Sequence, residues 1–175
     1  MTYEDNIESI KKMGLLSKNL IEEHGIPYID ISNLSVQDRR DSRKVGNRLL
    51  HDYVPLFIAE RTPMMYKLIK RDDIDRRKLN LLVISPGIIL SDGVYFSNGN
   101  VASEDTTCYS NDNLEKLEEL NWFLIRSGSW NDPDEEIKRI QKLEISAEVL
   151  IPDQVSPQWI VKIIPYDRKK RSYFF

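Results

Sequence analysis

Short helix-like and strand-like segments alternate irregularly along this chain, and this order constrains the fold more than any other feature of the sequence. Strands are expected over 53–59, 79–85, 93–97, 145–152 and 160–166, and helices over 7–13, 36–44, 62–70, 114–120 and 132–143. The segments between the strands lack the long, regular crossovers of a doubly wound fold. We therefore predict an α+β fold with a mixed or mainly antiparallel sheet.

Local signals mark the ends of several expected helices. Thr62-Pro63 is typical of an N-cap followed by the first helical turn. Asp132-Pro133 precedes two glutamates, and acids are favourable at the positive end of a helix dipole. Ser35, three residues before Asp38, indicates a capping box, and Gly14 is suited to end the first helix.

The composition excludes several classes of protein. A chain of 175 residues with 41% hydrophobic content is sufficient for one domain with its own core. A net charge of -3 argues against a broad basic surface for nucleic acid, so any such contact would need a local patch or stacking. One cysteine and two histidines permit no internal disulfide and no Cys/His zinc site. Because neither a membrane span nor a signal peptide is visible, we expect a cytoplasmic protein.

The expected strand 145–152 contains a carboxylate that strand propensity does not explain. Ile145, Ala147, Val149 and Ile151 alternate, as in a half-buried strand, which places Glu148 on the other face. Glutamate is a poor strand former and is rarely buried unpaired. From the residues alone, Glu148 could be catalytic, part of a structural ion pair, or simply exposed at an edge.

Two other stretches could carry chemistry, but taken singly neither identifies a function. The segment 37–43 (QDRRDSR) is most simply a solvated helix face, and the aromatic and methionine residues of 51–66 are more often core than a ligand platform. The motifs of P-loop and Rossmann nucleotide-binding sites are absent from the sequence.

Taken together, these stretches resemble the DarT family of DNA ADP-ribosyltransferase toxins. The segment 49–66 (LLHDYVPLFIAERTPMMY) is similar to the family's D-Y-V-P-F-Y-F strand followed by R-S-P-M-L-Y. Residues 38–43 (DRRDSR) resemble its E-R-R-x-R helix, and 146–151 (SAEVLI) its Q-A-E-[VF]-L-V strand. Residues 5–17 (DNIESIKKMGLLS) and 171–175 (RSYFF) are similar to its first helix and its last strand.

The resemblance implies a single domain over 1–175 with an ADP-ribosyltransferase-like fold, whose mainly antiparallel sheet is split and surrounded by short helices. It implies transfer of ADP-ribose from NAD to a base of single-stranded DNA, with thymine the expected base. The expected protein is a monomeric toxin that uses no metal and contacts no membrane, and a macrodomain antitoxin would be its partner.

The family's motifs also imply roles for individual residues. The expected catalytic residues are Glu148 and Arg40. The residues expected to bind NAD are Thr2, Asn6, Gln37, Arg40, Tyr53 and Phe57. Those expected to contact nucleic acid are Arg61, Met64, Tyr66, Trp130, Lys138, Arg139 and Lys142. A carboxylate fixed on a strand suits this reaction, because loss of nicotinamide passes through an oxocarbenium-like centre that a negative charge stabilises.

Two departures from the family pattern leave alternatives open. The family begins with an H-x-T strand, whereas here Thr2 occupies the Thr position and no histidine precedes it, so we expect weak binding of NAD. The family's Gln two residues before the glutamate is Ser146 here. The alternatives are therefore an ADP-ribosyltransferase with an RNA or protein acceptor, and a catalytically weak relative that binds nucleotide or nucleic acid.

Overall fold

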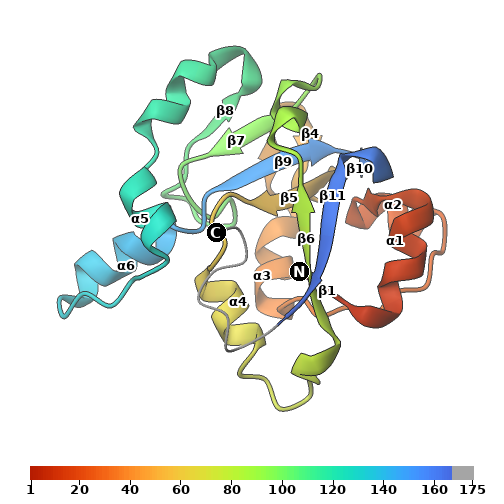
Figure 1. Cartoon of the computed structure of the whole chain (residues 1–175). Coiled ribbons are helices and arrows are strands. Elements are labelled where there is room, and N and C mark those ends of the chain that lie inside the picture. Colours follow the sequence, from red (N-terminus) through yellow and green to blue (C-terminus); the bar gives the residue numbers. More distant parts are fainter. Residues whose placement is uncertain (167–175) are drawn as a thin grey trace.

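The computed structural model describes residues 1–166 as an α+β fold in which short helices surround several small antiparallel sheets (Figure 1). The resemblance of 171–175 to a last strand therefore lies outside the described residues. Every strand pairing within residues 1–166 is antiparallel. The predicted fold class, an α+β fold with a split, mainly antiparallel sheet, is confirmed.

Two sheets form the centre of the molecule. The larger has the order β5-β9-β7-β8, and its strands are β5 (Tyr53–Phe57), β9 (Glu148–Pro152), β7 (Tyr95–Ser97) and β8 (Cys108–Ser110). The smaller has the order β1-β6-β11, and its strands are β1 (Thr2–Tyr3), β6 (Leu79–Ile84) and β11 (Ile160–Pro165). Because β9 lies between two neighbours, it is an internal strand with a fixed register.

Strand β9 differs from the half-buried strand that the alternation predicted. It begins at Glu148, because the helix before it continues to Glu144 and the backbone N–H groups of Ser146 and Ala147 still donate to carbonyls of that helix. Both faces of the strand are covered, so Glu148 and Leu150 are as buried as Ile151. Glu148 is therefore the first residue of a central strand.

The predicted signals at the ends of two helices are confirmed. Helix α1 (Ile7–Met13) ends at Gly14, where a β-carbon would meet the backbone of Val155. Helix α4 (Pro63–Leu68) begins after Thr62, whose side chain accepts a hydrogen bond from the Met65 N–H. None of the helices within residues 1–166 is long and apolar enough to cross a membrane.

Two other helices begin at different residues from those predicted. Helix α3 (Leu34–Asp41) begins after Asn33, and Ser35 donates to the Asn33 side chain, so the predicted capping box does not form. Helix α6 (Glu135–Glu144) begins after Asp134, whose carboxylate accepts from two backbone N–H groups. In both cases a nearby Asn or Asp occupies the N-cap in place of the expected residue.

The remaining elements are short. The helices without a predicted counterpart are α2 (Lys18–Glu23) and α5 (Trp122–Ser127), and the further strands are β2 (Leu15–Leu16), β3 (Lys44–Val45), β4 (Arg48–Leu49) and β10 (Gln154–Val155). The 3-10 helices are η1 (Glu4–Asn6), η2 (Leu50–Asp52), η3 (Arg76–Lys78), η4 (Pro86–Leu90), η5 (Asn111–Glu119) and η6 (Pro157–Trp159). The leucine spacing that predicted a helix over 114–120 thus belongs to η5, which is kinked at Asn113.

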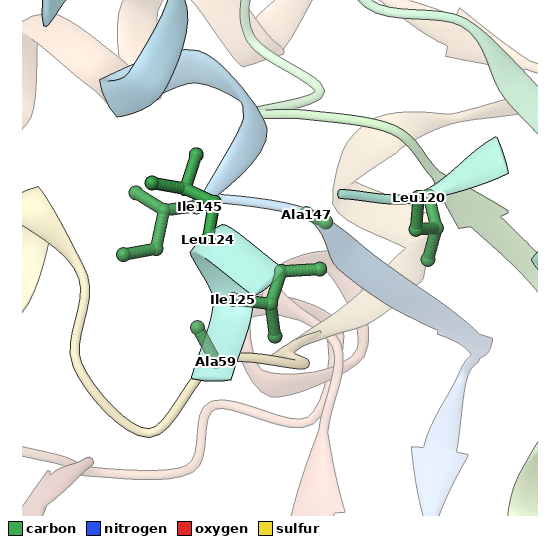
Figure 2. Packing of buried hydrophobic residues seen from close by; sticks show 6 residues of the cluster. All are labelled: Ala59, Leu120, Leu124, Ile125, Ile145 and Ala147. Carbon is green, nitrogen blue, oxygen red and sulfur yellow. The ribbon is translucent and has the colours of Figure 1, made fainter. Parts of the chain in front are cut away.

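A compact apolar cluster fixes the start of β9. Figure 2 shows its members, which come from the end of η5, from α5, from the segment just after β5 and from the turn that leads into β9: Ala59, Leu120, Leu124, Ile125, Ile145 and Ala147. Complete burial of a side chain of the size of Leu or Ile contributes roughly 1.5–3 kcal/mol. Helices α5 and α6 consequently lie together at the beginning of β9, on the opposite side of the molecule from α1 and α2 (Figure 1).

Candidate active site

Arg40 and Glu148 form a buried ion pair at the centre of the molecule. Arg40 Nη2 lies 2.5 Å from Glu148 Oε2, although the two residues are 108 positions apart in sequence. Arg40 is 4% exposed and Glu148 is 0% exposed. A contact between buried charges at this distance is short and charge-assisted. The structure thus joins the two residues for which the sequence suggested catalysis.

The carboxylate of Glu148 is held by the turn that follows β7 as well as by Arg40. The Val101 backbone N–H donates to Oε1 over 3.3 Å, and the Ser97 hydroxyl accepts from the Glu148 N–H over 3.0 Å. Gly99 permits this turn to approach α6, because a β-carbon there would lie 2.9 Å from Leu143 Cγ. Neither Ser97 nor Val101 was predicted as a site residue, since serine and valine at this spacing carry no distinctive pattern.

The end of α3 that carries Arg40 is fixed by the segment just before β5. His51 Nε2 lies 2.7 Å from Asp41 Oδ1, and the Leu50 N–H donates to the Arg43 carbonyl over 2.8 Å. The hydrogen bond from His51 lowers the pKa of the Asp41 carboxyl below its ordinary value, with Lys18 acting in the same direction. These contacts orient the helix, and therefore Arg40, toward the start of β9.

A large cleft runs beside the ion pair. Its walls are α3, β5, α4, β6, the loop 28–33 and the segment 128–146. Arg40 lines this cleft but Glu148 does not, because the guanidinium covers the carboxylate on that side. A ligand in the cleft would therefore meet Arg40 before it reaches Glu148.

The six residues expected to bind NAD occupy three different environments. Gln37, Phe57 and Arg40 line the cleft. Asn6 instead holds the loop 28–33, since its amide donates to the Ile29 carbonyl and accepts from the Ile29 N–H, and it also donates to Thr2 Oγ1. Thr2 and Asn6 thus shape a wall of the cleft and do not themselves line it.

Tyr53 lies in the core, not at the cleft. Its hydroxyl donates to the Val45 carbonyl over 3.0 Å, and its ring packs edge-on against Tyr95 with Arg48 over its face. Tyr53 does not line the cleft because it is 2% exposed and packs into the buried cluster around Leu150. The expected contact between this residue and NAD is not available in this arrangement.

All seven residues expected to contact nucleic acid line the cleft: Arg61, Met64, Tyr66, Trp130, Lys138, Arg139 and Lys142. Tyr66 on α4 and Trp130 before α6 meet edge to face, with ring centroids 6.1 Å apart, and Lys70 Nζ lies 4.2 Å from the Tyr66 centroid. Tyr66 is 47% exposed, so part of this aromatic surface is open to a planar ligand.

The three cations of α6 differ in their surroundings. Lys138 pairs with Glu135 at 2.7 Å, and Arg139 pairs with both Glu136 and Asp105. Lys142 is exposed, and no hydrogen bond or ion pair of its ammonium group occurs within residues 1–166. The predicted basic patch on this helix is therefore largely neutralised except at Lys142.

Three further residues of this region have defined roles. Arg71, which sequence reasoning missed, donates from Nη1 to the carbonyls of Ile31 and Ser32 and so fixes the loop 28–33. The Ser146 hydroxyl donates to the Lys142 carbonyl over 2.8 Å, so it helps to end α6. Burial raises the pKa of the Cys108 thiol to about 11, which leaves this thiol protonated and unreactive near neutral pH.

The arrangement suits transfer of a glycosyl-type group. A carboxylate fixed beside a cation and next to an open cleft can stabilise positive charge that develops on a sugar carbon. The guanidinium offers a planar pair of donors to a phosphate or to the edge of a base. Within residues 1–166, no group of three His, Cys, Asp or Glu side chains is placed to hold a metal ion.

The chain is similar along its length to one family of enzymes. The model of the DarT family, described as ssDNA thymidine ADP-ribosyltransferase, matches residues 1–173. A DNA ADP-ribosyl transferase-DNA ADP-ribosyl glycohydrolase fusion protein of Thermosipho africanus (strain H17ap60334) is 28% identical over 174 residues, which are 98% of this chain and 43% of that protein. A DNA ADP-ribosyl transferase of Thermus sp. (strain 2.9) is 29% identical over 144 residues, which are 77% of this chain and 66% of that protein. These two alignments thus cover less than two thirds of the length of each relative.

Solved structures of the same two relatives share the fold. Thermosipho africanus DarTG in complex with ADP-ribose superposes with a TM-score of 0.79 at 26% identity, covering 96% of this chain and 43% of the other. Thermus sp. 2.9 DarT in complex with ADP-ribosylated ssDNA superposes with a TM-score of 0.78 at 26% identity, covering 96% of this chain and 80% of the other.

Proposed function

The chain belongs to the DarT family, and from this membership we propose that it transfers ADP-ribose from NAD to a base of single-stranded DNA. The observation that carries the proposal is the buried ion pair between Arg40 and Glu148 beside the cleft. The complexes of the relatives with ADP-ribose and with ADP-ribosylated ssDNA support this chemistry.

In the proposed reaction, the bond between nicotinamide and ribose breaks and nicotinamide leaves with the electron pair. Glu148 stabilises the positive charge that develops on the ribose carbon. The base then forms a bond to that carbon and loses a proton, which Glu148 accepts directly or through water. Arg40 lies between this carboxylate and the cleft, where it can orient the pyrophosphate of NAD or the edge of the base.

We propose thymidine as the acceptor, in agreement with the description of the family. The base of thymidine carries one N–H group, at N3, and Watson–Crick pairing hides it. Reaction at this group would require an unpaired base, as for other enzymes that act on a base. The family's Gln is replaced here by Ser146, whose hydroxyl donates to the Lys142 carbonyl. We therefore propose that Arg40 and Glu148, and not Ser146, act on the acceptor base.

The cleft has room for distinct donor and acceptor contacts. For NAD we propose Gln37, Phe57 and Arg40, with Thr2 and Asn6 acting through the loop that Asn6 holds. For DNA we propose stacking on the Tyr66 and Trp130 pair, with Met64 beside it, and phosphate contacts from Arg61 and the α6 cations. Stacking contributes about 1–3 kcal/mol per base, which offsets an unfavourable net charge.

We further propose that the domain over 1–175 acts as a monomeric toxin in the cytoplasm, where it would meet single-stranded DNA. A glycohydrolase that removes the modification, built on a macrodomain, would be its antitoxin. The Thermosipho relative supports this pairing, because its name joins a DNA ADP-ribosyl transferase to a DNA ADP-ribosyl glycohydrolase.

The decisive experiment incubates the protein with NAD and a mixed-sequence single-stranded oligonucleotide, with matched duplex, tRNA and protein in parallel, and reads the products by mass spectrometry. We expect one ADP-ribose on the single strand, on thymine, and none on the duplex. Modification of tRNA or protein with an unchanged oligonucleotide would favour the alternative acceptors. NAD that is bound but never consumed would indicate a binding protein.

A further inference from the structure

A smaller hollow opens beside the cleft, between the end of α3 and the turn after β7. One side is formed by the end of α3 and the residues just after it, namely Arg39, Ser42 and Arg43. The other side is formed by Ala102, Ser103, Glu104 and Asp105. Arg39 and Ser103 also line the cleft, so the hollow and the cleft adjoin each other. An extended ligand could therefore occupy both.

Arg43 forms no ion pair within residues 1–166. Its side chain is half-buried, yet within residues 1–166 its guanidinium makes no hydrogen bond and no ion pair. Other arginines of the described chain, such as Arg48, Arg71 and Arg139, each pair with a carboxylate. A partly buried charge without a partner loses hydration without compensation, so it is unusual unless it serves a ligand.

The second guanidinium of the hollow is only partly engaged. Arg39 donates from Nε to the Ser35 carbonyl of its own helix, which leaves its terminal nitrogens available. Of the two acids at the hollow, Asp105 is paired with Arg139 over 2.9 Å, whereas Glu104 is exposed. Two guanidinium groups face one uncompensated carboxylate, so the hollow favours an anion. The Ser42 and Ser103 hydroxyls can add donors to it.

The hollow is close to the reacting groups. The Arg43 N–H donates to the Arg40 carbonyl over 3.2 Å, so the two residues belong to one turn at the end of α3. The charges of Arg40, Arg43 and Glu148 all influence the pKa of the Cys108 thiol, so the three side chains lie around this thiol. The opposite wall begins at Ala102, which directly follows Val101, the residue whose N–H donates to the Glu148 carboxylate. A phosphate at the hollow would thus be a short distance from a base at Glu148.

We propose that Arg39 and Arg43 bind a backbone phosphate of the substrate strand, next to the nucleotide whose base reaches Glu148. The inference rests on the proposed function, because it assigns a contact to that substrate. A guanidinium fork matches phosphate geometry in two parallel hydrogen bonds, and two such groups select a phosphodiester without reading sequence. The subsite explains how an acidic protein holds a polyanion at one defined position.

The test measures binding of a fluorescent single-stranded oligonucleotide to the full chain by anisotropy at several salt concentrations. Arg39→Gln and Arg43→Gln should each weaken binding about tenfold and make the log–log salt slope shallower by about 0.7. Lys44→Gln is the matched control, because Lys44 is exposed, lies next to Arg43 and does not line the hollow. Thermal unfolding verifies that all three variants are folded.

A second arm identifies the phosphate. Oligonucleotides with one neutral methylphosphonate linkage at successive positions should bind the unaltered protein weakly when that linkage adjoins the target base. Arg43→Gln should be insensitive to the same replacement. Equal losses for Lys44→Gln and the arginine variants, or no sensitive position, would overturn the inference. The inference would also be overturned if the arginine variants lost NAD affinity tenfold and kept their DNA affinity. The anion in the hollow would then be the pyrophosphate of NAD.

The outcomes separate the inference from the function on which it rests. If the unaltered protein modifies the oligonucleotide and the arginine variants bind it normally, the subsite alone is wrong. If the unaltered protein neither binds nor modifies any oligonucleotide, the proposed function fails and the subsite fails with it.

Discussion

Arg40 covers Glu148 on the side of the cleft, so the carboxylate is enclosed while the guanidinium still borders the space where a ligand would lie. Both residues are buried, but only Arg40 lines the cleft. The only hydrogen-bond partners of the Glu148 carboxylate within residues 1–166 are Arg40 and the Val101 N–H. Removal of one partner should thus have a different effect from removal of the other.

The first prediction concerns stability. Arg40→Met leaves an ionised carboxylate buried without its cation, and loss of one member of a buried pair costs about 3–5 kcal/mol. Glu148→Gln should cost less than half as much, because Arg40 can rotate toward water in the cleft. The measurement is the free energy of unfolding in urea for both variants. Equal losses would mean that Arg40 is as enclosed as Glu148 and cannot move to the cleft.

The second prediction concerns turnover. Glu148→Ala should reduce modification of the oligonucleotide by on the order of 10²–10³ or more, the usual effect of deleting one preorganised stabilising group. Glu148→Gln should be comparably slow, because the amide keeps the shape but not the charge. NAD binding, measured by calorimetry, should change much less. A rate near that of the unaltered protein would show that the carboxylate is structural.

The sequence indicated Arg40 and Glu148 as catalytic residues only through family resemblance, and it did not predict their contact, because no local pattern connects residues 108 positions apart. Local patterns did predict α1 and α4, because Gly14 ends α1 and Thr62 caps α4 through residues adjacent in sequence. The alternation before Glu148 predicted too long a strand, because periodicity does not reveal that α6 continues through Glu144.

Side-chain direction was the other limit of the sequence. Tyr53 and Phe57 stand on one short strand, yet one is in the core and the other lines the cleft. Neither the motif nor alternation distinguishes them, because residues four apart on a strand share a face, and only the packing of Tyr53 against Leu150 and Tyr95 sets its place in the core. Asn6 was expected at NAD, but its amide is used for the backbone of Ile29, a contact with no sequence signature.

The third prediction follows from that contact. Asn6→Ala should release the loop 28–33 and weaken NAD binding about tenfold, the effect of losing a net hydrogen bond of about 1–1.5 kcal/mol. Asn47→Ala is the matched control, because Asn47 lies in an exposed turn away from the cleft. The measurement is calorimetric titration with NAD. Unchanged affinity in Asn6→Ala would show that Arg71 alone fixes the loop.

The fourth prediction concerns acid. The hydrogen bond from His51 lowers the pKa of Asp41 below its ordinary 3.8, so this carboxylate contributes stability that is complete above that value. The contribution is lost as the pH falls through the lowered pKa of the folded state. Between about pH 5 and pH 2, the free energy of unfolding of Asp41→Asn should therefore decline less steeply than that of the unaltered protein.

The control for this experiment is Asp38→Asn, on the same helix. Asp38 is exposed, and within residues 1–166 its carboxylate makes no hydrogen bond or ion pair. Its replacement should leave the dependence on pH close to that of the unaltered protein. If Asp41→Asn also behaved like the unaltered protein, the His51 contact would not stabilise the end of α3.

The last prediction separates the cations of α6. Lys142 forms no ion pair within residues 1–166, whereas Lys138 is already paired with Glu135. Lys142→Glu should therefore weaken binding of single-stranded DNA more than Lys138→Glu, and the salt slope should become shallower by about 0.7 only for Lys142. Lys12→Glu is the control, because Lys12 is exposed on α1 and does not line the cleft. Its effect on binding reports the change in net charge alone. Anisotropy at several salt concentrations measures all three, and equal effects at Lys142 and Lys12 would show that DNA does not reach α6.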